Sequence, residues 1–158
     1  MPTMIETISY NECLTVWEQK LWPGRRGIGT ISAMLYAPEQ LEYKIDLTNL
    51  QFAATFFGLF DDGKLIGVNS GHKCADGSYR SRGLWVEPEF RGNGNGVKLL
   101  AATVQQAVTE DCSFIWSYPR LTSKKTYEAA GFTITSDWRS SDTSDNNAYC
   151  IKHLKGQL

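Results

Sequence analysis

Residues 91–96 of this 158-residue chain, Arg-Gly-Asn-Gly-Asn-Gly, have the composition of a turn that binds an anion through its backbone. Gly92, Gly94 and Gly96 have no Cβ, so the chain can adopt left-handed angles there and come close to a ligand. A helical pattern follows directly, and the first N–H groups of a helix lack partners within the helix. Together with the helix dipole these donors favour an anion, so the sequence predicts a diphosphate-binding turn.

Two familiar nucleotide-binding patterns fit this turn poorly. A Walker phosphate loop ends in Gly-Lys followed by Ser or Thr, whereas Gly96 is followed by Val97 and Lys98. The dinucleotide pattern G-x-G-x-x-G spaces its glycines differently and opens a domain, whereas this turn lies past the middle of the chain. The turn therefore indicates an anion site of another kind.

A third pattern fits two separate segments. Arg91 to Gly96 matches R-x-x-G-x-G, and Tyr127 to Phe132 matches Y-E-x-x-G-F. In this order and at this separation, the two motifs resemble those of the GNAT superfamily of acetyl-CoA-dependent N-acetyltransferases. The resemblance is clear over residues 50–135 and holds in outline over the N-terminal third. It implies the α/β (α+β) GNAT fold, a mixed, mostly antiparallel sheet of about six to seven strands flanked by about four helices.

The resemblance implies acetyl-CoA as the cofactor and assigns it a set of residues. The N–H groups of the turn would hold the pyrophosphate, and the backbone before it would pair with the pantetheine arm as an added strand. A backbone N–H near Val86 would face the thioester oxygen. The implied cofactor-binding residues are Leu84, Trp85, Val86, Arg91, Gly92, Asn93, Gly94, Asn95, Gly96, Ser117, Ser123 and Tyr127.

The resemblance also makes Tyr127 the expected general acid, because a phenol with a pKa near 10 can protonate a departing thiolate. The competing interpretation is a core tyrosine. Family members often carry a base at the positions of Arg80 and Arg82, but arginine cannot act as a base at neutral pH. Water, or His72 on the neighbouring strand, must then take the proton, or activity is lost. The family's usual Asn, seven residues before Tyr127, is replaced by Arg120.

The two strand arginines suggest an acceptor site. Side chains two apart on a strand share a face, so Arg80, Arg82, Leu84 and Val86 are expected to line one side of the acceptor cleft. The guanidinium fork suits a carboxylate or phosphate, which favours a small amine that bears an acidic group. The candidate substrate-binding residues are Arg80, Arg82 and, in the loop of residues 24–29, Arg25 and Arg26.

Two other functions remain open from the sequence. An acidic acceptor peptide would also suit the arginines, so the enzyme could acetylate a protein N-terminus or a lysine. The missing base also keeps open a non-catalytic CoA-binding regulatory module, since resemblance in fold does not establish a function. Release of CoA thiol with a panel of amines would separate these alternatives.

Composition limits the remaining possibilities. The length predicts one domain over residues 1–158, and the net charge of −1 without a basic run argues against nucleic-acid partners. No apolar stretch approaches the roughly 20 residues that span a bilayer, so we expect no membrane partner. The four cysteines and two histidines lack ligand spacing, which predicts no metal site and reduced cysteines in a cytoplasmic protein. A homodimer is compatible with this interpretation.

Hydrophobic periodicity predicts the elements that position these residues. Ser9 to Glu12 has the form of a capping box, Gly131 ends a helix, and residues 137–147 form a polar loop. Thr122 or Ser123 is expected to cap the helix that ends at Ala130. Expected strands cover residues 4–8, 52–60, 65–72, 79–86, 114–118, 132–138 and 148–154, and expected helices cover residues 10–21, 32–36, 97–108 and 123–130.

Overall fold

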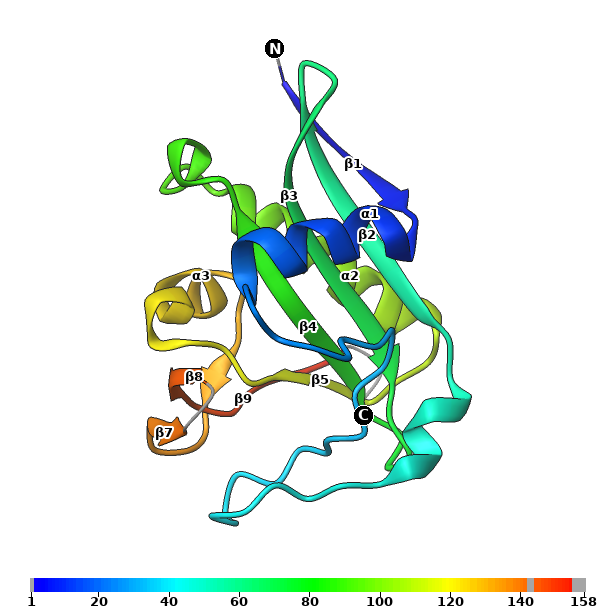
Figure 1. Ribbon diagram of the computed structural model, residues 1–158. Coiled ribbons are helices and arrows are strands. Elements are labelled where there is room, and N and C mark those ends of the chain that lie inside the picture. Colours follow the sequence, from blue (N-terminus) through cyan, green and yellow to red (C-terminus); the bar gives the residue numbers. More distant parts are fainter. Residues whose placement is uncertain (1, 142–143, 155–158) are drawn as a thin grey trace.

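The computed structural model describes residues 2–141 and 144–154 (Figure 1). Three α-helices within them are α1 (Tyr10–Val16), α2 (Asn95–Thr109) and α3 (Lys124–Ala129). A π-helix (Trp17–Leu21) continues α1, and short 3₁₀ turns cover Leu47–Gln51, Pro88–Phe90 and Leu121–Ser123. The strands are β1 (Thr3–Ile8), β2 (Ala54–Asp61), β3 (Lys64–Lys73), β4 (Tyr79–Val86), β5 (Phe114–Ser117), β6 (Thr133–Ile134), β7 (Arg139–Ser141), β8 (Ser144–Asn147) and β9 (Cys150–His153).

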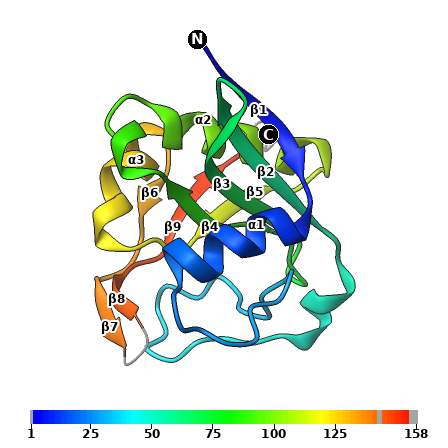
Figure 2. The same cartoon turned by 45° about the horizontal axis from the view of Figure 1, so that its top comes forward.

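Seven of these strands form one twisted sheet in the order β1-β2-β3-β4-β5-β9-β6. Every neighbouring pair is antiparallel except β4 and β5, which are parallel. Helix α1 crosses one face of the sheet and α2 covers the other, as the two views in Figures 1 and 2 agree. The predicted fold class, a mixed and mostly antiparallel sheet with flanking helices, is confirmed. Among the described residues, no helix combines the length and apolarity needed to cross a membrane.

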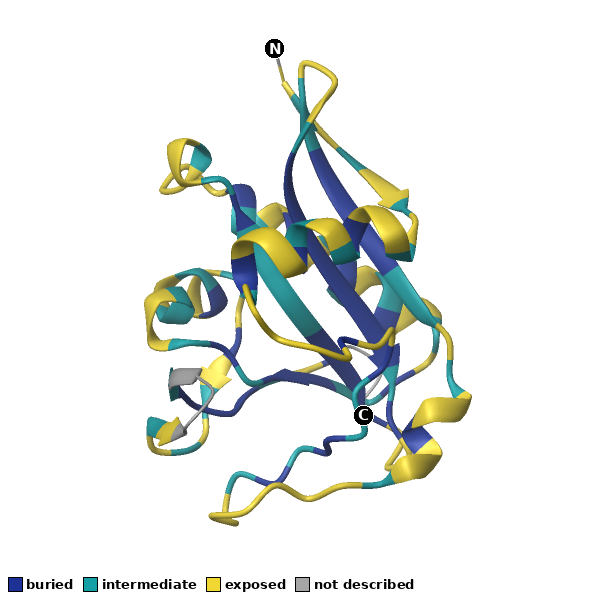
Figure 3. Ribbon diagram, in the orientation of Figure 1, coloured by how far each residue is buried: buried dark blue, intermediate teal, exposed yellow. Residues whose placement is uncertain are grey.

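Two apolar cores hold the helices on the sheet. On the α1 face, Trp17 packs with Phe56 and Val68, and on the α2 face Leu99 packs with Ile66 and Val86. Figure 3 shows the consequence, with β3 mostly buried and β4 buried at its two ends and half-buried in between. Burying apolar side chains from both faces is what fixes β4, the strand that leads into the glycine turn, in place.

The predicted capping box starts α1. The Ser9 hydroxyl accepts a hydrogen bond of 3.1 Å from the Glu12 N–H, and the Glu12 carboxylate accepts one of 3.0 Å from the Ser9 N–H. The following π-helix closes with a bond of 2.7 Å from the Trp22 N–H to the Trp17 carbonyl. This wider turn ends the helix at Leu21, and the π-helix contacts β4.

The predicted helix at residues 32–36 is wrong. Met34 bridges Ile45 in antiparallel fashion, and hydrogen bonds of 2.8 Å join the Leu35 N–H to the Lys44 carbonyl and the Asp46 N–H to the Ala33 carbonyl. Five residues are too few to nucleate a stable helix, so long-range pairing determines the conformation.

The C-terminal elements are shorter than predicted. Of residues 132–138 only Thr133–Ile134 pairs with β9, because the chain then leaves the sheet and the Ser136 hydroxyl accepts a bond of 2.9 Å from the Tyr149 N–H. The predicted polar loop contains a hairpin, β7 with β8, whose turn lies outside the described residues. The Ser123 side chain makes no capping bond to α3, which begins instead from a 3₁₀ turn.

A glycine bulge in β4 overturns one predicted face. Ser70 pairs with Arg82 but Val68 pairs with Trp85, so β4 contains one residue more than β3 between these points. The extra residue lies at Gly83, whose φ of 82° is left-handed. A Cβ there would lie 2.4 Å from Trp17 Nε1, which donates a hydrogen bond to the Gly83 carbonyl. Only glycine meets both conditions.

The bulge shifts the alternation of side chains along β4. Arg82 lies on the same face as Trp85, whereas Val86 packs on the opposite face against Leu99 of α2. The expectation that Arg80, Arg82, Leu84 and Val86 share one face is therefore wrong. A strict period of two assumes a regular ladder, and one inserted residue reverses the faces beyond it.

Candidate active site

The site lies where β4 and β5 separate. Within the described residues their ladder joins only Tyr79 to Ile115 and Arg80 to Trp116. The last link is the Ser117 hydroxyl, which donates a bond of 2.8 Å to the Ser81 carbonyl. Beyond it the parallel strands diverge, and two adjoining cavities open beside the second half of β4.

The first, which we call the glycine-turn cavity, has a volume of about 590 Å³. It lies between the end of β4, the glycine turn, the start of α2 and α3. Its lining residues are Lys20, Leu21, Leu84, Trp85, Val86, Arg91, Gly92, Gly94, Asn95, Gly96, Val97, Arg120, Thr122, Ser123, Lys125, Thr126 and Ala129.

Glycine geometry leaves the floor of this cavity open. Gly92 and Gly94 have φ values of 83° and 85°, and a Cβ on either would meet no protein atom within 4 Å. Gly94 is the residue that precedes α2, so the unpaired first N–H groups of that helix border the cavity. Gly96 differs, because a Cβ there would lie 2.7 Å from Thr126 of α3. The absence of a Cβ at Gly96 lets α2 and α3 approach each other.

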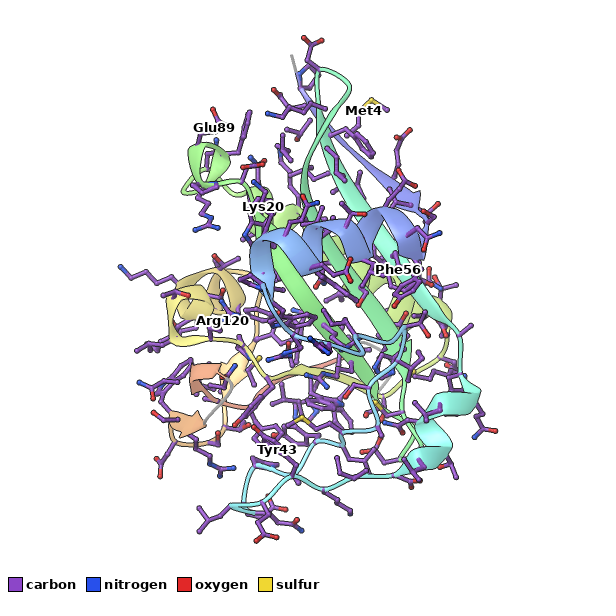
Figure 4. All side chains as sticks on the ribbon, viewed as in Figure 1. Met4, Lys20, Tyr43, Phe56, Glu89 and Arg120 are labelled. Atoms are coloured by element: carbon purple, nitrogen blue, oxygen red, sulfur yellow. The ribbon has the colours of Figure 1, made fainter. Side chains whose placement is uncertain are left out.

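The glycine-turn cavity is strongly cationic. Its lining includes Lys20, Arg91, Arg120 and Lys125 and no acidic residue. Arg91 donates a bond of 2.6 Å from Nε to the Val86 carbonyl, which fixes its guanidinium beside the end of β4. In Figure 4, Lys20 and Arg120 come from the end of the first helix and from the segment before α3. Cations, glycines and free helix N–H groups together fit a phosphate-rich ligand such as CoA.

The second cavity, the arginine cavity, has a volume of about 260 Å³ and shares Leu21, Leu84, Arg120 and Ser123 with the first. Arg25, Arg80, Arg82 and Arg120 line it, and its lining includes no Asp, Glu, Lys or His. The other lining residues are Leu21, Trp22, Ser32, Met34, Tyr43, Gly83, Leu84, Ser117, Tyr118, Pro119, Ser123, Tyr127 and Asn147.

Arg80 is a buried cation without an anionic partner among the described residues. Its side chain is 9% exposed and stacks over Trp116 at 4.8 Å, and Nη1 donates a bond of 2.9 Å to the Ser32 hydroxyl. Its Nε has no hydrogen-bond partner among those residues. Burial lowers the pKa of Arg80, which shows that its environment disfavours the charge it carries. A buried guanidinium with a free donor is a ready anion site.

Arg82 lies beside Arg80 on the same strand. It donates a bond of 2.9 Å from Nη1 to the Gly29 carbonyl and stacks over Trp17 at 5.1 Å. Burial, followed by repulsion from Arg80 and Arg25, lowers the pKa of Arg82 to about 9, so it remains a cation at neutral pH.

Two further arginines complete the cluster. Arg25 is exposed and stacks over Trp22 at 4.8 Å, while Arg120 donates a bond of 2.7 Å from Nη2 to the Leu21 carbonyl. Arg120 occupies the position of the family's usual Asn and lines both cavities. Arg120 therefore places a positive charge where the two cavities adjoin.

Tyr127 and Ser117 meet in the wall between the strands. Tyr127 is 2% exposed, and its hydroxyl lies 3.1 Å from the Ser117 hydroxyl. Because the Ser117 proton is donated to the Ser81 carbonyl, the Tyr127 hydroxyl is the donor of this pair. Burial raises the pKa of Tyr127 to about 12, which keeps the phenol protonated at neutral pH. Tyr127 lines the arginine cavity, where it can supply a proton.

His72 lies outside both cavity linings. It is fully buried, its Nδ1 lies 2.8 Å from the Lys73 carbonyl, and its Nε2 accepts a bond of 3.4 Å from the Ser32 N–H. Burial lowers the pKa of His72 to about 3. Both ring nitrogens of His72 are bonded to backbone groups, so no lone pair is directed at a substrate. His72 is therefore not part of the proposed mechanism.

Some of the site residues predicted from the sequence line the two cavities, and others do not. Arg26 and Asn93 line neither cavity, and the Asn95 side chain instead donates a bond of 2.9 Å to the Phe90 carbonyl. Lys20, Lys125 and Tyr43 line the cavities but were not expected there. No local motif marks these three residues, since the fold brings them in from the π-helix after α1, from α3 and from the loop before β2.

Comparison with known proteins identifies the class. The model of the acetyltransferase (GNAT) family matches residues 16–132, so the chain belongs to this family. It is an acyltransferase that uses acetyl-CoA, as the two motifs implied. A search of curated proteins found no match to the sequence.

Solved structures agree with the fold at low identity. An acetyltransferase of the GNAT family from Staphylococcus aureus Mu50 is 14% identical with a TM-score of 0.65, over 98% of this chain and all of that one. A Bacillus anthracis protein solved in complex with acetyl coenzyme A is 16% identical, with a TM-score of 0.62 over 97% and 100%. The Escherichia coli ribosomal-protein-S18-alanine N-acetyltransferase is 12% identical, with a TM-score of 0.60 over 99% of both chains.

Proposed function

We propose that this protein is an N-acetyltransferase whose acceptor is a small primary amine bearing an acidic group. One observation carries the proposal: Arg80 and Arg82 lie side by side in the arginine cavity, and no carboxylate lines that cavity. Only one ion pair occurs among the described residues, between Lys124 and Glu128 on α3. A ligand that brings a carboxylate or phosphate would satisfy the free guanidinium donors.

The glycine-turn cavity would hold the cofactor. The N–H groups around Gly92, Gly94 and the start of α2 suit a pyrophosphate, and Lys20 and Lys125 are placed to meet further phosphate oxygens. Acetyl-CoA supplies an activated acetyl group as a thioester. The open edge of β4 after the bulge suits an extended arm that adds as a strand.

Tyr127 is the proposed general acid. Transfer of an acetyl group requires the amine nitrogen to gain a bond to carbon, the carbon–sulfur bond to break, and the sulfur to gain a proton. The ammonium form of the acceptor first loses one proton to solvent, and the nitrogen loses a second during transfer, so one proton is released overall. The Tyr127 phenol can donate its proton to the sulfur and regain one from the second proton that the nitrogen loses, and Ser117 holds the phenol oxygen in the cavity wall.

The test is a panel of acceptors followed by CoA thiol release. L-glutamate and O-phosphoethanolamine represent acidic amines, spermine and an aminoglycoside represent polycations, and short peptides represent protein acceptors. We expect the acidic amines to react and the polycations to fail, because four arginines repel a polycation. Reaction of a neutral peptide N-terminus in preference to all small amines would contradict the proposal. Binding of acetyl-CoA without turnover of any amine would indicate a non-catalytic module.

A further inference from the structure

The proposed function requires the acceptor amine to lose a proton in the arginine cavity. An amine attacks a thioester only in its neutral form, yet no residue that lines this cavity can accept a proton at neutral pH as a carboxylate or imidazole would. The titratable and charged groups facing the cavity come from the loop before β2, β4, the segment after β5 and α3. They are Arg25, Tyr43, Arg80, Arg82, Tyr118, Arg120 and Tyr127.

We propose that the four arginines hold the bound acceptor amine in its neutral form and so take the place of a general base. This inference rests on the proposed function, because it concerns the amine of that reaction. Arg80 and Arg82 bind the acidic group of the acceptor, and Arg25 and Arg120 act on its nitrogen through their charge. The proton leaves to solvent before the nitrogen attacks.

The charge balance supports this role. Four guanidinium groups face the cavity, and an acceptor with one acidic group leaves a positive excess around its amine. Nearby cations disfavour a further cation, and a partly buried site weakens the screening by water. Burial is the main cause of the lowered pKa of Arg82 and of Arg25, and repulsion adds to it: Arg80 and Arg25 act on Arg82, and Arg120 acts on Arg25.

Within the part of the chain that the structure describes, no carboxylate lines the arginine cavity. Burial is the main cause of the lowered pKa of Arg80, and the groups that oppose it electrostatically are thiols and phenols rather than carboxylates, namely Cys74, Tyr127, Tyr149 and Tyr43. Arg91 and Lys125 in the adjoining glycine-turn cavity would be neutralised by phosphates, whereas the arginine cavity contains no such counter-charge. The positive field is therefore directed at the acceptor.

A lysine introduced into the cavity measures this field without any substrate. Met34 lines the arginine cavity and has an unbranched side chain, so Met34→Lys places an ammonium there. We expect the pKa of the introduced lysine, followed by NMR, to lie below the usual value of about 10.4. Burial also contributes to this fall, so the decisive quantity is the change on removing one arginine charge.

Arg25→Gln supplies that change with little risk to the fold, because Arg25 is exposed and its guanidinium stacks on Trp22. One unit charge at roughly 8 Å, with an effective dielectric constant between about 20 and 80, corresponds to a shift of about 0.4 to 1.5 pH units. We expect Arg25→Gln to raise the pKa of the introduced lysine by this amount. Lys64→Gln removes the same charge from the exposed first residue of β3 and should leave that pKa unchanged.

Three outcomes would overturn the inference: an ordinary lysine pKa, no response to Arg25→Gln, or equal responses to Arg25→Gln and Lys64→Gln. If Met34→Lys fails to fold, Tyr43→Lys places the reporter at a position that is 48% exposed and lines the same cavity. Neither reporter needs acetyl-CoA or an acceptor. The inference can therefore fail while the acceptor panel succeeds, and the reverse is equally possible.

The pH dependence of kcat provides the kinetic counterpart, because it reports groups in the enzyme–substrate complex. The probe is L-glutamate or O-phosphoethanolamine, whichever the panel shows to react faster. We expect the kcat midpoint to lie below the pKa of the free amine, and Arg25→Gln to move it upward by about 0.4 to 1.5 units. A midpoint at or above the pKa of the free amine would contradict the inference.

Discussion

The two cavities offer positive charge to a ligand by different means. In the glycine-turn cavity, backbone N–H groups and mostly exposed cations surround a wide space of about 590 Å³. In the arginine cavity, the buried guanidinium group of Arg80 and the half-buried one of Arg82, each stacked on an aromatic ring, line a space of about 260 Å³. Backbone geometry depends little on which side chains surround it, so the first cavity fits a ligand common to the family. The second cavity depends on the identity of its side chains, and we expect it to determine the acceptor.

The largest expected effect concerns Tyr127, the proposed general acid in the wall of the arginine cavity. Tyr127→Phe keeps the ring and removes the proton, so we expect kcat to fall by roughly ten- to ten-thousand-fold, the range for lost general-acid help. Steady-state kinetics should show little change in KM for acetyl-CoA.

Tyr149→Phe is a matched control for this variant. Tyr149 is also fully buried, but it lines neither cavity, and its hydroxyl has no hydrogen-bond partner among the described residues. We expect its kcat to equal that of the wild type. Equal losses in both variants would mean that Tyr127 acts only through packing.

The next effect separates the two cavities. Gly94→Val forces a branched side chain to φ of 85° and fills the space in front of α2. Loss of one charge-assisted backbone bond corresponds to about 1.5–3 kcal/mol, so calorimetry should show acetyl-CoA binding weakened by roughly ten- to over a hundredfold. KM for the acceptor should change much less.

Gly77→Val controls for backbone strain, because Gly77 has φ of 87°, an equally open Cβ position and a place in the β3–β4 turn far from both linings. Unweakened binding in a folded Gly94→Val variant would remove the turn from the cofactor site. Gly96 is a poor choice for this test, since a side chain there would meet Thr126.

The smallest catalytic effect is expected at His72, which lies behind the arginine cavity. Its pKa falls from 6.5 to about 3 on burial, so the unfolded chain binds a proton that the folded chain excludes between these values. Stability is therefore lost as pH falls below about 6.5. Denaturant unfolding should show a decrease of about 2 kcal/mol between pH 7.5 and pH 5 from this residue.

His72→Gln should reduce that pH dependence and leave the pH profile of kcat unchanged. The variant keeps hydrogen-bonding groups near the Lys73 carbonyl and the Ser32 N–H. A profile that loses an inflection in this variant would restore His72 as the base.

The sequence predicted the sheet, the glycine turn and α2 because local signals agree there with tertiary packing. Periodicity failed at Gly83, where a single residue that fits under Trp17 reverses the faces of β4. It also failed at residues 32–36, where pairing with the segment around Ile45 determines the conformation. Long-range contacts of this kind leave no signal in a local window.

The candidate site likewise contains residues that local signals identify and residues that only long-range contacts bring in. The turn glycines could be identified from their spacing, and Arg120 was noticeable because it departs from the family pattern. Lys20 and Tyr43 could not be predicted, because a π-helix and an irregular loop bring them to the cavities. The contact of Tyr127 with Ser117 depends on how β5 and α3 meet, which no motif describes.

The central claim is that the arginine cavity binds an acidic group on the acceptor. The most direct measurement compares kcat/KM for the acidic acceptor and its ester, each with the wild type and with Arg82→Ala. We predict that either change alone lowers kcat/KM by about ten- to over a hundredfold, as expected for a charge-assisted bond. The two losses should not add, because both remove one contact. Fully additive losses, or a wild-type enzyme that prefers the ester or spermine, would contradict the account.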